Sequence, residues 1–266
     1  MEQRYFIELS FKGTAYHGWQ TQPNAVSVQQ TIEEALALLV KEKVRVNGAG
    51  RTDTGVHASY FVAHFTFSSG LLSPPEEIRR KLNHMLPPDI AIMSIFPVKE
   101  KDHSRFSALS RTYKYYISKQ KNPFRQETTF YTGVWPDIDE MNKAAAELFN
   151  YSDFSSFCRS NTNVGNHICK IMHACWEDKD EMLIFTIKAN RFLRNMVRAI
   201  VGTMLNIGYG KQTVGNFREI IEAKDRRKAG KSAPPQGLFL TDIEYPAGLM
   251  KQKISPITKS NQNEHP

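Results

Sequence analysis

The sequence contains few cysteines. The three that occur, Cys158, Cys169 and Cys175, are odd in number and form no CxxC pair. Neither a disulfide framework nor a standard zinc site is therefore supported. Free cysteines are usually buried in folded proteins, so we expect three buried thiols.

Long apolar runs are also missing. No stretch of the 266 residues approaches the roughly 20 apolar residues that a membrane helix needs. The N-terminus opens on a strand-like pattern and not on a basic segment followed by an apolar signal core. We therefore expect a cytoplasmic protein without a membrane partner.

Acidic residues are scarce around one glycine-rich segment, which reads GAGRTDTGVHAS at residues 48–59. Between Glu42 and Glu76 the one acid is Asp53. Over the whole chain, 35 Lys and Arg stand against 27 Asp and Glu, which gives a net charge of +8. This excess fits a polyanionic partner, and it equally fits solubility charge spread over every face.

The segment around Asp53 allows two interpretations. Gly50 and Gly55 have the spacing of a phosphate loop, but the Lys-Ser/Thr that follows in such loops is missing. In one interpretation Asp53 is a turn residue whose carboxylate bonds its own backbone. In the other, Arg51 helps to keep the carboxylate ionised, and a lone carboxylate suits nucleophilic attack or proton abstraction. Two-metal hydrolysis and ordinary glycosidase chemistry need at least a second acid.

The order of predicted elements repeats along the chain. The first half has predicted strands at 4–11, 44–49, 60–67 and 90–98, with helices at 28–39 and 74–85. The second half has predicted strands at 111–118, 167–177, 182–189 and 238–245, with helices that begin near 137, 191 and 217. This order is typical of a ferredoxin-like antiparallel sheet with helices on one face. We predict an α+β fold of two similar ferredoxin-like or RNP-like domains with mostly antiparallel sheets, at residues 1–104 and 105–246, and a polar tail at 247–266.

Cations and aromatic rings gather in three later segments. Residues 105–116 read RFSALSRTYKYY and offer rings for base stacking, although alternating Tyr113 and Tyr115 also suit one face of an ordinary strand. Residues 190–202 read NRFLRNMVRAIVG and carry three arginines at helical spacing without an acid, which favours an anionic surface over a solvated face. Those arginines are Arg191, Arg194 and Arg198. A loop at 224–238 adds Arg226 and Lys228. His57 is either a phosphate donor or a packed core histidine.

Several of these segments resemble, in the right order, the motifs of the bacterial tRNA pseudouridine synthase A family. They read FKGTAYHGWQ with Gln22, GAGRTDTGVHA, RFSALSRTYKYY, FLRNMVRAIVGTML and APPQGLFL. Three positions depart from the family pattern: Lys12 stands where an aspartate is usual, Tyr16 replaces a phenylalanine, and Gln236 replaces a frequent His or Glu. None of the three is at Asp53.

The resemblance implies two similar domains with a central cleft, and isomerisation of uridine to pseudouridine at positions 38 to 40 of the tRNA anticodon stem-loop. It implies no metal, nucleotide or other cofactor. By the same resemblance Asp53 is the catalytic residue, Tyr113 stacks on the target base, Arg198 pairs with the catalytic carboxylate, and Arg51 helps to extrude the base. The family is homodimeric.

The charge pattern adds a hypothesis of its own. Four cations are expected to hold the phosphate backbone of the RNA: Arg191, Arg194, Arg226 and Lys228. Two alternatives are a non-catalytic tRNA-binding protein, with Asp53 as a turn residue, and a metal-dependent nuclease. Catalysis is favoured because an acid inside a basic surface would only repel phosphate in a protein that merely binds.

Overall fold

One sheet runs through the residues that the computed structural model describes, which are 2–67, 73–160, 162 and 165–250. Within them it has nine strands, in the order β4-β1-β3-β9-β5-β8-β7, while β2 pairs with β3 and β6 with β5. The strands are β1 (Gln3–Phe11), β2 (Asn47–Gly48), β3 (His57–Phe67), β4 (Ile90–Val98), β5 (Ser110–Ser118), β6 (Phe130–Tyr131), β7 (Ile171–Lys179), β8 (Met182–Ala189) and β9 (Leu238–Glu244). All pairings are antiparallel except β3 with β9 and β5 with β6. The predicted α+β class with a mostly antiparallel sheet is confirmed.

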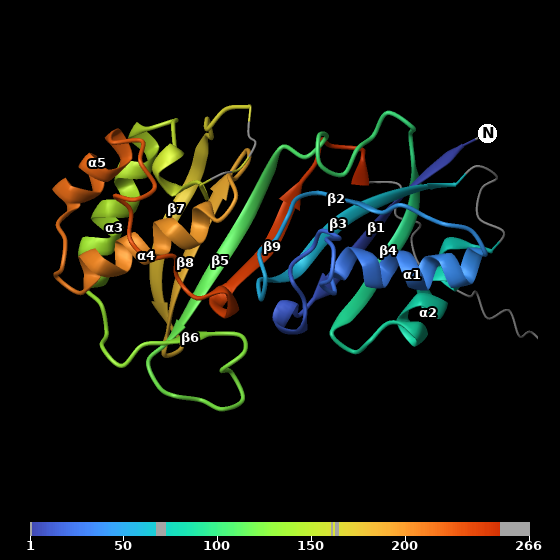
Figure 1. Cartoon of the computed structure of the whole chain (residues 1–266), viewed down its shortest axis with the longest axis horizontal. Coiled ribbons are helices and arrows are strands. Elements are labelled where there is room, and N and C mark those ends of the chain that lie inside the picture. The colour runs from blue at the N-terminus through green and yellow to red at the C-terminus, as the bar shows by residue number, and fades with distance from the viewer. Residues whose placement is uncertain (1, 68–72, 161, 163–164, 251–266) are drawn as a thin grey trace, which may run out of the picture.

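Five α-helices accompany the described part of the sheet, and they fall into two groups. Figure 1 shows α1 and α2 beside β1, β3 and β4, and α3, α4 and α5 beside β7 and β8, with β5 and β9 between the groups. The helices are α1 (Val28–Val40), α2 (Pro75–Met85), α3 (Ile138–Glu147), α4 (Met196–Gly208) and α5 (Val214–Glu222). The predicted helix starts at Ser27 and Asp137 are confirmed, because both side chains accept hydrogen bonds from backbone N–H groups of the first turn.

The last strand joins the two halves of the sheet. Strand β9 pairs in parallel with β3 at His57 and Ala58, and antiparallel with β5 from Ser110 to Tyr115. The last strand of the chain therefore lies in the middle of the sheet, and it pairs with the end of the glycine-rich segment. The division into domains at residues 1–104 and 105–246 stays a prediction, and residues 251–266 of the expected polar tail lie outside the described residues.

Several predicted elements are wrong in extent: the strand expected at 167–177 begins at Ile171, the helix expected near 217 begins at Val214, and two others bear on the site. The helix expected from Arg191 begins only at Met196, because Asn195 has φ 65° and a left-handed residue cannot continue a right-handed helix. Arg191 and Arg194 therefore lie in the loop before α4 and share no helical stripe with Arg198. The strand expected at 44–49 pairs only at Asn47 and Gly48, although Val44 and Val46 are buried as their alternation predicts.

The remaining general predictions concern thiols and membranes. Cys158 and Cys169 are buried and Cys175 is half-buried, and all three are free, so burial is confirmed for two of the three. Among the described residues, no helix has the length and apolar character needed to cross a membrane.

Candidate active site

Asp53 lies in the loop between β2 and β3, and neighbouring residues fix the shape of this loop. An added Cβ on Gly48 would overlap the indole of Trp19, which stacks on Phe61 with ring centroids 4.2 Å apart. Gly55 has φ +76°, a conformation that favours glycine. Its N–H donates to the carbonyl of Tyr16 at 3.3 Å. The glycines thus let the loop pass close to the core and turn sharply.

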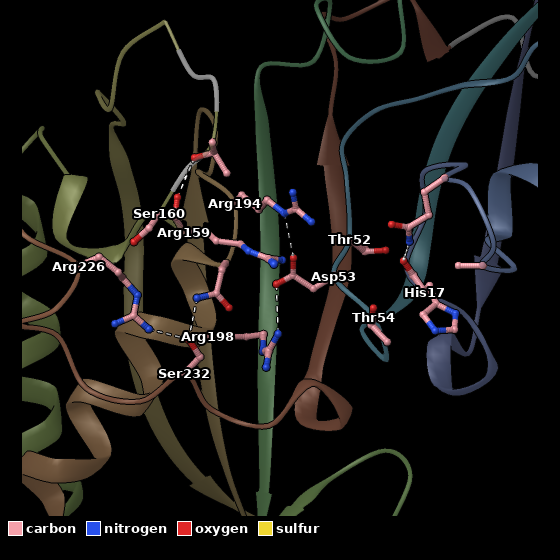
Figure 2. Close-up of a pocket in the computed structure, with 14 residues that line it drawn as sticks. His17, Thr52, Asp53, Thr54, Arg159, Ser160, Arg194, Arg198, Arg226 and Ser232 are labelled. Atoms are coloured by element: carbon pink, nitrogen blue, oxygen red, sulfur yellow. Dashed lines mark hydrogen bonds and ion pairs between the residues drawn. The ribbon is translucent and has the colours of Figure 1, made fainter.

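The carboxylate of Asp53 faces two arginines. Nη1 of Arg198 lies 3.2 Å from Oδ2, and Nε of Arg194 lies 3.9 Å from Oδ1 (Figure 2). The side chains of Asp53 and Arg198 are only 17% and 18% exposed. The backbone of Asp53 does form a turn, because its carbonyl accepts from the N–H of Val56 at 3.1 Å. The side chain, however, is directed to the arginines. Two positive charges therefore lie against this carboxylate.

Helix α4 and the loop before β9 position Arg198. Its Nε donates to the carbonyl of Ala233 at 2.8 Å, while the N–H of Ala233 donates to the carbonyl of Arg198. Arg198 lies in the first turn of α4, where the positive end of the helix dipole also favours an anion. The arginine is thus fixed independently of Asp53.

A cavity of about 950 Å³ opens at Asp53, a size that suits a nucleotide. Both halves of the chain line it. Its lining residues are His17, Gln22, Ala25, Thr52, Asp53, Thr54, Arg159, Ser160, Thr162, Arg194, Asn195, Arg198, Arg226 and Ser232. Four arginines and one carboxylate therefore line the cavity, and the wall favours an anionic ligand (Figure 2). The hydroxyl of Thr52 is buried without a hydrogen-bond partner in the described structure.

Tyr113 lies on β5 with 9% of its surface exposed, and its ring is perpendicular to that of Phe192, with the ring centroids 5.1 Å apart. Burial raises the pKa of Tyr113 to about 12, Arg111 opposes this shift, and the negative charge of Asp53 adds to it. Among the described residues the Tyr113 hydroxyl has no hydrogen-bond partner. The structure thus brings this tyrosine within electrostatic range of Asp53.

Arg51 is exposed, and no ion pair joins it to Asp53 in the described structure. Partial burial is the main cause that lowers the pKa of Arg51, and the positive charges of Arg105 and Arg194 lower it further. Among the other predicted cations, Arg226 lines the cavity and donates to Ser232 Oγ at 2.9 Å. Arg191 and Lys228 lie outside the lining, with Arg191 donating to Asn166 Oδ1 at 3.0 Å and Lys228 exposed.

The structure settles the open question about His57. Its ring is fully buried, stacks on Phe239 at 4.5 Å, and accepts a hydrogen bond from the N–H of Gly13 at 2.9 Å. Burial lowers its pKa, so the ring is a neutral core residue and not a phosphate donor.

Sequence reasoning missed Arg159 and Asn195. The N–H of Arg159 donates to the carbonyl of Arg194 at 3.0 Å, which draws Arg159 to the cavity, and Asn195 Nδ2 donates to Ser232 Oγ at 2.7 Å. Their positions depend on hydrogen bonds between distant segments, for which the sequence has no periodic signal. Among the described residues, no group of three or more His, Cys, Asp or Glu is arranged to hold a metal ion.

Comparison with known proteins gives consistent matches. The model of a family described as tRNA pseudouridine synthase matches residues 9–107 and 144–246. The tRNA pseudouridine synthase A of Bacteroides fragilis is 51% identical over 250 residues, which cover 94% of this chain and 99% of that protein. The proteins of the same name from Parabacteroides distasonis and Lysinibacillus sphaericus are 49% and 40% identical over 247 residues each. These matches cover 93% and 91% of this chain, and 98% and 100% of the relatives.

Proposed function

The chain belongs to the tRNA pseudouridine synthase family, and from this premise we propose that Asp53 is the catalytic residue of its reaction. The protein is an isomerase that converts uridine to pseudouridine in tRNA. The observation that carries the proposal is the ion pair of Asp53 with Arg198, 3.2 Å long, in the wall of a cavity of nucleotide size. No other acidic side chain lines this cavity in the described structure.

The reaction needs one well-placed carboxylate. The N-glycosidic bond between N1 and C1′ breaks, the uracil turns while it is held, and a C5–C1′ bond forms. The C5 proton is lost to water and N1 takes up a proton from water, so the product is an isomer of the substrate. Asp53 attacks the ribose or the uracil, or removes a ribose 2′ proton to give a glycal. Each route uses the carboxylate as a base or nucleophile, and Arg198 and Arg194 lie where their positive charges face it.

Other side chains recognise the target nucleotide. Tyr113 stacks on the flipped uracil; it does not line the cavity in the described structure, but the charge of Asp53 acts on its hydroxyl, which stays protonated with a pKa of about 12. Arg51 helps to extrude the base from the helix, for which its exposed position beside the catalytic loop is suited. Unstacking costs a few kcal/mol, an amount that stacking and phosphate contacts can offset.

The remaining cations bind the RNA backbone. Arg194 and Arg226 contact phosphates at the cavity, and Arg191 and Lys228 contact them farther along the strand. The substrate segment is the anticodon stem-loop at positions 38 to 40, the reaction uses no metal or cofactor, and the protein acts as a cytoplasmic homodimer. In the described structure Asp53 is the one acid that lines the cavity, and an acid among arginines gives no advantage to a protein that merely binds RNA.

The test uses tRNA that carries tritium at uridine C5, without added metal or cofactor. Wild-type protein should release tritium to water, and the variant Asp53→Asn, which keeps the shape and removes the charge, should release none while binding the tRNA. The matched control is Asp89→Asn, which removes a carboxylate outside the cavity that accepts from the Tyr16 hydroxyl. Equal tritium release by both variants would refute the role of Asp53. RNA cleavage that EDTA abolishes would indicate the nuclease alternative instead.

A further inference from the structure

The connection between β4 and β5 is hydrogen-bonded to the start of the catalytic loop. Oγ of Ser104 donates to the carbonyl of Asn47 at 2.8 Å. The guanidinium of Arg111 donates through one nitrogen to the carbonyls of Ala49, at 3.0 Å, and Arg105, at 2.6 Å. Arg105 is therefore held next to Ala49, two residues before Arg51.

Phe106 is exposed in this well-anchored connection. It exposes 75% of its surface, although its ring lies 4.4 Å from that of His103 and 5.5 Å from the guanidinium of Arg105. The backbone N–H groups of Arg105 and Phe106 both donate to Nδ1 of His103, at 3.1 and 3.4 Å. An exposed ring on a fixed backbone loses little conformational entropy when a planar ligand stacks on it.

The charge around this ring is positive. Arg51 and Arg105 are both exposed and neither is in an ion pair within the described structure, while Arg194 has Asp53 as its acidic partner. Arg111 Nη2 bridges the carbonyls of Ala49 and Arg105, which places Arg105 beside the segment that carries Arg51, and the charges of Arg105 and Arg194 both lower the pKa of Arg51. Arg51 is thus under the influence of Arg194, which lines the cavity, and of Arg105, which lies beside Phe106.

We propose that Phe106 and Arg105 form a second nucleotide site beside the cavity, which stacks one unpaired base next to the target uridine and binds its phosphate. The proposal deepens the proposed function, because the ligand is the same RNA strand whose target base enters the cavity. A base offers a flat π-face and its phosphate offers the negative charge, and this pair matches an exposed ring beside unpaired arginines. An apolar protein segment would leave those arginines unpaired, so RNA is favoured over a protein partner.

The chain provides a matched control at the other end of β5. Phe124 is 95% exposed in the connection between β5 and β6, beside the exposed Arg125. The connection that carries Phe106 precedes β5 and this one follows it, at the opposite end of the strand (Figure 1). Phe124→Ala and Arg125→Gln thus remove the same groups from a place outside the proposed site.

The first test measures affinity for a synthetic anticodon stem-loop RNA by fluorescence anisotropy, with Asp53→Asn as the background so that no turnover occurs. Phe106→Ala should weaken binding about tenfold, Phe106→Trp should retain it, and Phe124→Ala should leave it unchanged. Arg105→Gln should lower the slope of log K against log salt by about one, and Arg125→Gln should not. Equal affinities for the Phe106→Ala and Phe124→Ala proteins would overturn the proposal and leave Phe106 as a surface for a protein partner.

The second test identifies the base. Abasic nucleotides are placed one at a time beside the target uridine, and each RNA is measured with and without Phe106→Ala. One abasic position should weaken binding to the protein with Phe106 about tenfold and have no further effect on the Phe106→Ala protein. Additive effects at every position would overturn the proposal, because the ring would then act without touching a base. Tritium release is measured separately in the wild type, so failure of the proposed catalysis is distinguished from failure of this site.

Discussion

Gly18 packs against the backbone of Thr52 and Asp53. Its replacement by alanine tests whether the position of Asp53 limits the proposed reaction. An added Cβ on Gly18 would lie 2.2 Å from the carbonyl oxygen of Thr52 and 3.2 Å from the carbonyl carbon of Asp53. Gly18 also has φ +90°, which L side chains rarely adopt. Gly18→Ala therefore combines backbone strain with direct pressure on the two residues that precede Thr54.

The expected magnitudes follow from this geometry. The strain costs about 1–3 kcal/mol of the free energy of unfolding. An ordinary contact requires the Thr52 carbonyl to move away by roughly 1 Å, and a displacement of that size at reacting groups costs about 10²-fold in rate. Because Asp53 moves with Thr52 whereas Arg198 is held by the Ala233 carbonyl, the geometry of the ion pair changes. We expect kcat to fall about 100-fold.

The assay is tritium release at saturating tRNA, with thermal unfolding of each protein measured alongside. The control is Gly210→Ala, since Gly210 has φ +68° and no heavy atom within 4 Å of the added Cβ. That variant should lower Tm by a few degrees through strain alone and keep the wild-type kcat. If Gly18→Ala keeps the kcat of Gly210→Ala, the reaction does not depend on the loop position and the reasoning is refuted.

Three further predictions concern charge. Arg198→Met leaves Asp53 without its close partner at 17% exposure and should lower kcat about 30-fold, with a smaller loss for Arg198→Lys; unchanged tritium release by the Met variant would contradict it. Arg226→Gln should weaken tRNA binding and lower its salt slope by about one, as measured by filter binding, whereas an unchanged slope would place phosphate elsewhere. Burial lowers the pKa of His64 from its ordinary 6.5 to about 3. The neutral ring that the fold buries therefore costs nothing above pH 6.5, whereas between pH 6.5 and 3 the unfolded chain binds a proton that the folded protein does not. The free energy of unfolding falls over that range by about 1.4 kcal/mol per pH unit. His64→Gln should flatten that slope in urea titrations between pH 6.5 and 4, and an equally steep slope would show that other groups cause it.

The sequence predicted the elements whose own residues determine them. Alternating apolar residues located the strands at Ile90 and Met182, and Ser27 located the start of α1 to the residue. Such patterns arise because one face of each element is buried, so they can be found without knowledge of the neighbours. The single acid in the glycine-rich segment was recognised in the same way, because its isolation is a property of the sequence.

The predictions that were wrong or missing concern residues whose positions depend on distant partners. Nothing local indicates that Asn195 has φ 65°, so three arginines at helical spacing were expected on one helix of which the structure contains only Arg198. The contribution of Arg159 requires its N–H to meet the carbonyl of Arg194, 35 residues away in the chain. Periodicity reports burial of one face, and it carries no information about which loops meet across a cavity.

In the proposed mechanism, the arrangement of Arg198 allows a lone acid to act inside a basic cavity. Its Nε is held by the Ala233 carbonyl and its backbone by α4, so its position does not depend on the ion pair with Asp53. The carboxylate can therefore move toward a bound nucleotide while the compensating charge stays in place. A preorganised cation of this kind needs no reorganisation when charge shifts during the reaction, which is the condition under which electrostatic stabilisation is most effective. The glycines of the loop serve the same end, because they set the position of Asp53 through its backbone and leave its oxygens to the arginines and the substrate.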